Sequence, residues 1–274
     1  MPTPESRPRG LPRLRSWVIG AVVIVVITVA LVGSLNPSRA PERAAPSPVA
    51  TFNDDAPADP STPQQPSAPP QLPVTVTDVG NTPALALLTR IPIKPALTMA
   101  GYDRTGDFGR AWLDENHNGC DTRNDILARD LTDITRSGGC KVMTGLLVSP
   151  YTDVLIHFQR GVKTSALVQI DHVVALGDAW ETGAQALSQA QRETLANDPL
   201  ELLAVDGRSN DVKGDKDASE WLPGNADFEC AYVARQVSVK FAYRLWVTVA
   251  ERSAMKAVLT RCPNQKATAS QFTH

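Results

Sequence analysis

The sequence is poor in aromatic residues and lacks a strong net charge. Aromatic residues make up 5% of the 274 residues, whereas proline accounts for 22 of them, so we expect part of the chain not to form a packed core. The formal net charge is -2, and residues 1–16 hold four arginines against one glutamate, which leaves -5 for the rest. This balance excludes a protein that coats nucleic acid through its overall charge, although an active site needs only a local basic patch.

Cysteine is also scarce, and none of the four cysteines stands in a C-x-x-C pattern. That spacing is typical of zinc ribbons and thioredoxin-type sites, so neither is expected. An even number of cysteines in an exported protein indicates disulfides. Of the three pairings we favour Cys120–Cys140 and Cys230–Cys262, because each closes a local loop. Each would contribute about 3 kcal/mol in the chain-entropy estimate.

Charged residues are missing altogether from residues 17–35. At about 1.5 Å per residue, a helix of this length spans roughly 28 Å, which is enough to cross the hydrocarbon core of a bilayer. The basic tail at residues 1–16 favours a cytoplasmic N-terminus and an exported remainder. A cleaved signal peptide, which would make the protein secreted, is the alternative. We favour the uncleaved transmembrane anchor, because the run is long and the small-residue site ending at Ala40 is followed by Pro41.

Residues 36–73 are rich in Pro, Ala, Ser, Gln and Asp. Such a segment cannot bury enough apolar surface to offset the entropy cost of ordering it. We therefore predict an extended, disordered linker between the membrane anchor and one folded domain at residues 74–274.

Hydrophobic patterns within residues 74–274 predict an α+β domain. Its strands should include a β-hairpin and two further strands, at 141–148, 154–158, 167–171 and 200–205. Its helices should lie at 84–88, 125–133, 178–196 with a break at Gly183, from Ser209, 228–247, and after the capping box formed by Thr248 and Glu251.

The strand predicted at 167–171 leads into Asp171-His172, which places a carboxylate beside an imidazole. Hydrolysis of a phosphodiester needs an activated water, for which a histidine with a pKa near 6.5 is suited. It also needs charge neutralisation, which a hard divalent cation on oxygen ligands supplies. Asn210 offers such an oxygen, and Lys213 and Lys216 could hold phosphate. An Asp-His pair alone more often marks an ordinary hydrogen bond, so the whole pattern must carry the interpretation.

The whole pattern resembles a known family. The runs IDHVVAL, NDPLELLAVDG and SNDVKGDKDASEWLP are similar, in this order, to HNH endonucleases of the type found as the C-terminal part of GmrSD restriction enzymes (DUF1524, His-Me finger superfamily). The resemblance extends from about Tyr102 to Cys262. It implies a ββα-metal core, a general base at His172, and a divalent cation such as Mg²⁺ on Asp171 and Asn210. It also implies a nucleic-acid substrate, for which DNA is favoured over RNA.

One position departs from the family pattern. HNH proteins commonly carry a middle Asn in the second strand, where it orients the catalytic loop, and here Glu201 stands nearest that place. Glu201 could orient His172 as a hydrogen-bond acceptor, and we include it among the catalytic residues. It could equally indicate a weak or inactive nuclease.

Further side chains are candidates for phosphate or metal binding. Arg123 and Arg235 are candidate phosphate contacts, with solvated helix charges as the alternative. The Asp114-x-Asn116-x-Asn118-Gly119 segment, completed by Asp125, nearly matches the spacing of a calcium loop. The alternative there is a polar turn beside a disulfide. His157 lies within a predicted strand and His274 is terminal, so both compete poorly with His172 as a base.

We therefore expect a membrane-anchored, metal-dependent endonuclease with an extracytoplasmic domain. That location argues against a restriction enzyme guarding the cell's own interior. The alternative is a catalytically weak or inactive envelope module that keeps the fold and binds a partner. A secreted antibacterial toxin would differ only in its target.

Overall fold

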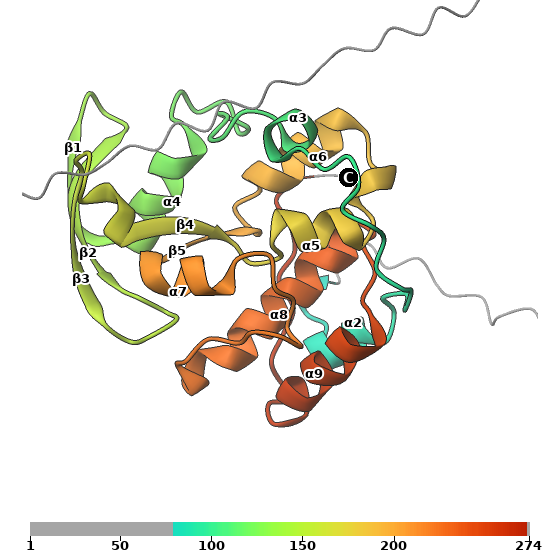
Figure 1. The fold of residues 1–274 in the computed structure, drawn as a ribbon. Helices are drawn as coiled ribbons and strands as arrows, with labels where there is room; N and C mark the ends of the chain where they lie inside the picture. The colour runs from blue at the N-terminus through green and yellow to red at the C-terminus, as the bar shows by residue number, and fades with distance from the viewer. Residues whose placement is uncertain (1–78, 273–274) are drawn as a thin grey trace, which may run out of the picture. The chain divides into compact units, whose positions relative to one another are not determined.

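The structure, a computed structural model, describes residues 79–272, which form two antiparallel sheets among helices (Figure 1). This confirms the α+β class predicted from the sequence. The predicted cytoplasmic tail, anchor and linker lie outside the described residues. Within residues 79–272, no helix combines the length and the apolar character needed to span a bilayer.

The larger sheet has the order β1-β2-β3 and contains the predicted hairpin. Its strands are β1 (Thr132–Ser137), β2 (Lys141–Val148) and β3 (Leu155–Gln159). The sequence analysis missed β1, because its side chains are mostly exposed and polar and therefore show no apolar alternation. The turn between β1 and β2 is made by Gly138 and Gly139, both with positive φ.

The smaller sheet pairs β4 (Val168–His172) with β5 (Leu202–Asp206), and His172 stands opposite Leu202. Side chains alternate between two apolar clusters. Ile170 and Ala204 pack with α4 and the larger sheet, whereas Leu203 and Val205 pack with the helices of the other side. Figure 1 shows this pair between the three-stranded sheet and helices α8 and α9. His172 thus ends a strand held by one cluster, and Val173 and Val174, which follow it, belong to the other.

Helix α7 (Gly207–Lys213) follows β5 directly and packs on β4. Asp206 caps it by accepting a hydrogen bond of 2.8 Å from the Ser209 N–H. A Cβ at Gly207 would lie 2.1 Å from the backbone oxygen of Ala166, so this close approach requires glycine. Because residues three apart share a helix face, Asn210 and Lys213 both reach β4.

The remaining helices surround this centre, and several of their ends differ from the predicted ones. The break predicted at Gly183 within residues 178–196 is confirmed, since Gly183 has a φ of 134° and lies between two separate helices. The helix predicted to reach residue 247 ends at Ala242, close to Arg244 with its positive φ. The helices are α2 (Ala84–Leu88), α3 (Arg104–Phe108), α4 (Thr122–Asp130), α5 (Leu176–Glu181), α6 (Gln189–Asn197), α8 (Ala226–Ala242) and α9 (Val249–Thr260), with 3-10 turns η1 (Ser165–Leu167) and η2 (Ala184–Ala186).

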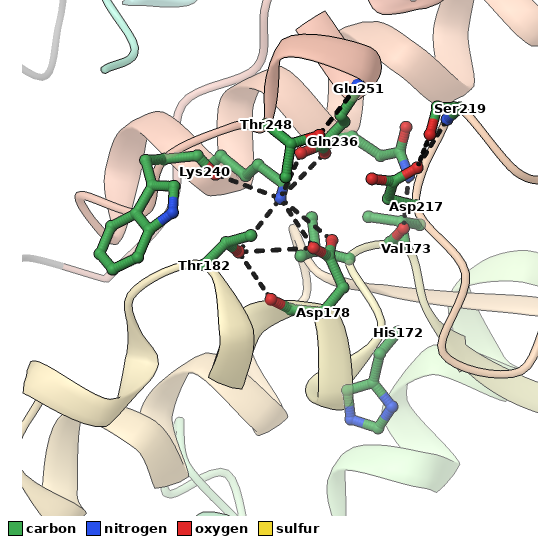
Figure 2. Close-up of polar contacts among 12 residues, drawn as sticks. His172, Val173, Asp178, Thr182, Asp217, Ser219, Gln236, Lys240, Thr248 and Glu251 are labelled. Atoms are coloured by element: carbon green, nitrogen blue, oxygen red, sulfur yellow. Dashed lines mark hydrogen bonds and ion pairs between the residues drawn. The ribbon is translucent and has the colours of Figure 1, made fainter. Parts of the chain in front are cut away.

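Two disulfides and one buried ion cluster join these elements. Cys120 is bonded to Cys140 and Cys230 to Cys262, the pairing favoured from the sequence. The cluster centres on the fully buried Lys240 of α8, whose Nζ lies 3.0 Å from Asp178 Oδ2 and 2.9 Å from Glu251 Oε1. It therefore ties α5, α8 and α9 together, and Figure 2 shows His172 on the other side of Asp178, pointing away from it.

Candidate active site

The His172 side chain is buried and both of its ring nitrogens have partners. Nε2 lies 3.0 Å from the Ala196 carbonyl oxygen, which can only accept, so Nε2 carries the hydrogen. Nδ1 is left as an acceptor, 3.4 Å from Arg104 Nη2. Burial, and then the charge of Arg104, lower the pKa of His172 to about 3. The imidazole is therefore neutral near pH 7, with Nδ1 as its acceptor, and a pKa this low makes it a weaker base than the histidine with a pKa near 6.5 expected from the sequence.

The backbone that follows His172 is held at several points. The His172 carbonyl accepts from Lys213 Nζ at 2.7 Å. The Val173 carbonyl accepts from Gln236 Nε2 at 2.9 Å and from the Tyr232 hydroxyl at 3.2 Å. The Val173 N–H donates to the Glu201 carbonyl at 2.9 Å. These bonds fix the direction in which the strand leaves the sheet, and with it the orientation of the imidazole.

Glu201 contributes to the same support, although it does not touch the imidazole. Its Oε2 accepts the Val174 N–H at 3.2 Å, two residues beyond His172. Burial raises the pKa of the Glu201 carboxyl well above its usual range, which favours the neutral form of the group. Among the described residues, Oε1 has no hydrogen-bond partner. Glu201 therefore holds the loop after β4, whereas the sequence analysis considered a direct contact with His172.

Asp171 is buried between two donors. Its Oδ2 accepts from the Tyr151 hydroxyl, and its Oδ1 accepts from Lys213 Nζ at 2.9 Å. A carboxylate has about four lone-pair sites, so these bonds leave acceptor capacity for a further ligand. Burial and the charge of Asp171 raise the pKa of Tyr151 well above its usual range, which keeps this hydroxyl a donor.

Lys213 does not occupy the position expected of a phosphate contact. Its side chain is fully buried, and its ammonium group is used by Asp171 and the His172 carbonyl. An ammonium removed from solvent in this way cannot reach a phosphate without breaking a buried ion pair. The structure therefore gives Lys213 a supporting position beneath the site.

Asn210 lies at the edge of the same pocket as Asp171 and His172. This pocket has a volume of about 160 Å³, and Arg104 and Asp215 also line it. The Asn210 Nδ2 donates to Gln169 Oε1 at 2.8 Å. The side-chain oxygen Oδ1 of Asn210 takes no part in this bond and can therefore bind a cation. The structure therefore brings together three of the site residues expected from the sequence and adds an arginine and an aspartate.

The other predicted phosphate contacts lie elsewhere. Arg123 donates to the Val168 carbonyl at 3.0 Å, and Arg235 donates to the carbonyls of residues 199, 200 and 202. Lys216 is exposed, with its Nζ 2.6 Å from the Val212 carbonyl. None of these three side chains lines the pocket that holds His172.

Several residues of the site were not predicted from the sequence. Arg104 precedes His172 by 68 positions, and no local pattern links the two. Trp112 stacks on the imidazole with 6.2 Å between ring centroids and 15° between planes. Asp215 had a usable signal, because it stands two residues after Lys213 in the same polar run.

The calcium-like loop is compact. Asp114 Oδ2 accepts the Gly119 N–H at 2.8 Å, while Asp125 Oδ2 accepts from the side-chain amides of Asn116 and Asn118 at 3.3 and 3.0 Å. Four oxygen-bearing side chains therefore converge there. Over residues 79–272, however, no three or more His, Cys, Asp or Glu side chains form a group that could hold a metal ion. Calcium binding remains a prediction.

The fold and the pocket define an α+β protein whose polar site is built around a neutral histidine at a strand end. Residues 121–258 match the family described as GmrSD restriction endonucleases, C-terminal domain, which confirms the resemblance seen in the sequence. The chain therefore belongs to this nuclease-type family. The predicted catalytic residues and the predicted Mg²⁺ ligands lie within the matched range, whereas Arg104 and most of the calcium-like loop lie before it.

A fungal protein is similar to most of the chain. It is described as an uncharacterized secreted protein of Arthroderma benhamiae, and it is 34% identical over 204 residues. The match covers 74% of this chain and 93% of the relative. No solved structure shows a significant match.

Proposed function

We propose that the protein is a divalent-cation-dependent endonuclease that hydrolyses phosphodiester bonds, with DNA as the favoured substrate. The observation that carries the proposal is the single pocket in which Asp171, His172 and Asn210 meet. Membership of an endonuclease-type family supports it independently. We further propose that β4, β5 and α7 constitute a ββα-metal core, since β4 supplies Asp171 and His172, β5 pairs with it antiparallel, and the helix that follows supplies Asn210.

The side-chain oxygen atoms that line the pocket suit a magnesium ion. Mg²⁺ keeps several of its waters and is usually held by one or two carboxylates together with substrate phosphate oxygens. Asp171 has acceptor capacity left, and Asn210 Oδ1 is not used by the bond to Gln169. These two residues would hold the ion, with Asp215 as a further oxygen donor in the same pocket. Bound there, the cation would neutralise charge on the phosphate and the leaving oxygen.

His172 would act as the general base. Its Nδ1 takes one proton of a water molecule, while the bond between Nε2 and the Ala196 carbonyl keeps the imidazole oriented. The water oxygen forms the new bond to phosphorus, the bond from phosphorus to the leaving sugar oxygen breaks, and solvent protonates that oxygen. Glu201 and Lys213 hold the backbone beside His172 during this step.

We also propose that this domain acts outside the cytoplasm. Its two disulfides are typical of an oxidising compartment, and the fungal relative is described as secreted. The apolar run at residues 17–35 would anchor the domain of residues 74–274 to the membrane, or release it if cleaved.

A non-enzymatic binding module is the second candidate, and two observations favour it. Glu201 replaces the Asn common in HNH proteins, and Arg104 covers His172 Nδ1 in this structure. Such a module would bind a partner through the same pocket without cleaving nucleic acid.

The proposal is tested by cleavage of supercoiled plasmid by the full chain while the Mg²⁺ concentration is varied. We expect Asn210→Ala to raise the half-saturating Mg²⁺ concentration about tenfold or more, by analogy with the loss of groups that support a bound metal. Asn264→Ala, at an exposed asparagine remote from the pocket's lining, is the matched control. A wild-type protein that leaves plasmid intact with Mg²⁺ would favour the binding module. An unchanged Mg²⁺ dependence for Asn210→Ala would remove Asn210 from the metal site.

A further inference from the structure

Two adjoining pockets share the side chains of Arg104, His172 and Leu176. The first is the pocket of about 160 Å³ that contains Asp171 and Asn210. The second is smaller, about 70 Å³, and Arg110 and Trp112 line it. His172 therefore stands where the two meet, with Arg104 beside it in both. A nucleic-acid strand that crosses both pockets over His172 would therefore place its phosphates close to Arg104.

Arg104 is a cationic side chain that can bind an anion in these two pockets. Its side chain is exposed, and among residues 79–272 no carboxylate lies within ion-pair distance of its guanidinium. Lys213, by contrast, is neutralised by Asp171 and buried. The hydrogen bond from Arg104 to His172 is long, at 3.4 Å, so exchanging it for a charged acceptor costs little.

The backbone that carries Arg104 is well anchored, although its side chain is exposed. Asp103 caps α3 by accepting the Thr105 N–H at 3.1 Å. The Tyr102 ring packs against Trp180 with 5.8 Å between centroids, and against Phe108 with 6.3 Å. Arg104 thus projects from a fixed turn, so binding an anion would order its side chain but not the segment that carries it.

We propose that Arg104 binds the scissile phosphate, an inference that rests on the proposed nuclease function. The planar guanidinium fork matches two phosphate oxygens, which a buried ammonium such as that of Lys213 cannot do. When Arg104 turns to the phosphate, it leaves His172 Nδ1, and a water molecule takes its place as the hydrogen-bond donor. Substrate binding therefore uncovers the base. Arg110, exposed in the adjoining pocket, continues the basic surface toward the next phosphate.

The direct test is binding of a short fluorescein-labelled DNA duplex to the full chain in EDTA, where cleavage is blocked, measured by fluorescence anisotropy at several salt concentrations. We expect Arg104→Gln to weaken binding about tenfold and to reduce the slope of log K against log salt by about 1. Arg104→Lys should retain the slope. Arg136→Gln, at an exposed arginine of β1 that lines neither pocket, should bind as the wild type does.

Cleavage with Mg²⁺ separates the phosphate contact from a purely structural role. We expect Arg104→Gln to lower kcat about 100-fold, as removal of one charge-stabilising donor does in other enzymes. Arg104→Lys should recover part of this loss. Unchanged metal-free affinity and salt slope in Arg104→Gln would overturn the inference, even if kcat fell. If the wild type binds DNA through Arg104 but never cleaves it, the contact between Arg104 and a phosphate is supported and the proposed nuclease activity is refuted.

Discussion

Lys213 and Arg104 carry the same charge beside one histidine but have opposite surroundings. Lys213 is fully buried and paired with Asp171, whereas Arg104 is exposed beside His172 Nδ1. A buried charge that loses its partner is strongly destabilising, because neither solvent nor another ion compensates it. The two residues should therefore respond differently to substitution: one mainly in stability, the other in binding.

Replacing Lys213 by methionine tests the first of these responses. We expect Lys213→Met to lower the free energy of unfolding by about 3–5 kcal/mol, because Asp171 is left as an uncompensated buried carboxylate. Denaturant unfolding followed by fluorescence measures it. Lys216→Met, at the neighbouring exposed lysine, should stay within about 0.5 kcal/mol of the wild type. Equal losses in the two variants would refute the structural position given to Lys213.

Glu201 is predicted to act as a neutral acceptor. Because burial favours the neutral form of its carboxyl, Glu201→Gln should preserve the hydrogen bond to the Val174 N–H, leaving the free energy of unfolding near that of the wild type and the rate of plasmid cleavage within a few-fold of it. Glu201→Ala leaves that buried N–H unpaired and should cost about 1–3 kcal/mol. Unfolding and cleavage measured on both variants decide the matter. A Gln variant as impaired as the Ala variant would show that the acid itself is needed.

The sequence allowed only part of this site to be predicted. Asp171, His172 and Asn210 belong to local patterns whose spacing is visible in the chain, and the structure places them around one pocket. The contact of Arg104 with His172 depends on packing between segments 68 positions apart. The hydrogen bond from Tyr151 to Asp171 likewise joins residues 20 positions apart. Neither leaves a local signal.

At the scale of elements, a buried cluster of two acidic side chains and one lysine holds α5, α8 and α9 together. The pKa of Glu251 is raised to about 8, chiefly by burial, against a usual value of 4.5. The unfolded carboxyl loses its proton near pH 4.5 and the folded one near pH 8, so this group's contribution to stability is fully present at low pH. It falls as the pH rises through that window and stays low above it.

Replacing Glu251 by glutamine should remove this contribution. We expect the free energy of unfolding of Glu251→Gln to fall less between pH 4.5 and 8 than that of the wild type, because the amide cannot ionise. Asp178 retains the ion pair with Lys240 in the variant. Denaturant unfolding at several pH values supplies the comparison. The same pH dependence in both proteins would mean that Glu251 is already ionised at low pH.

The loop from Asp114 to Asp125 carries the prediction of calcium binding. Its four oxygen-bearing side chains already converge, with Asp125 Oδ2 accepting from both asparagine amides. We expect calorimetric titration of the wild type with Ca²⁺ to show binding, and the double variant Asp114→Ala, Asn116→Ala to lose it. Asn264→Ala is the control. Equal heats from the wild type and the double variant would leave the loop as a polar turn.

Elements were predictable where an apolar pattern accompanies them. Strand β2 (Lys141–Val148) lies where it was predicted, and the apolar runs gave β4 and β5 to within two residues at either end. Strand β1 was missed because its polar side chains face solvent. Helix α4 begins three residues before its predicted start, since Asp121 caps it through the Asn124 N–H at 2.8 Å.

For the molecule as a whole, the site lies where two apolar clusters meet. One cluster packs β4 and β5 against α4 and the larger sheet, and the other packs β5 and the residues that follow β4 against the surrounding helices. The disulfides lie in different parts of this arrangement: Cys120–Cys140 connects the segment before α4 to the β1-β2 turn, and Cys230–Cys262 connects α8 to the end of α9. The strand end that carries His172 is thus supported from both sides.

The central claim is that His172 is the base of a nuclease, and cleavage of supercoiled plasmid by the full chain with Mg²⁺ tests it most directly. We expect His172→Ala to lower the initial rate at least about 100-fold, as loss of a general base does. His157→Ala, at an exposed histidine of β3, should cleave at the wild-type rate. Thermal unfolding of each variant verifies that it is folded. Cleavage by folded His172→Ala at the wild-type rate would contradict the account.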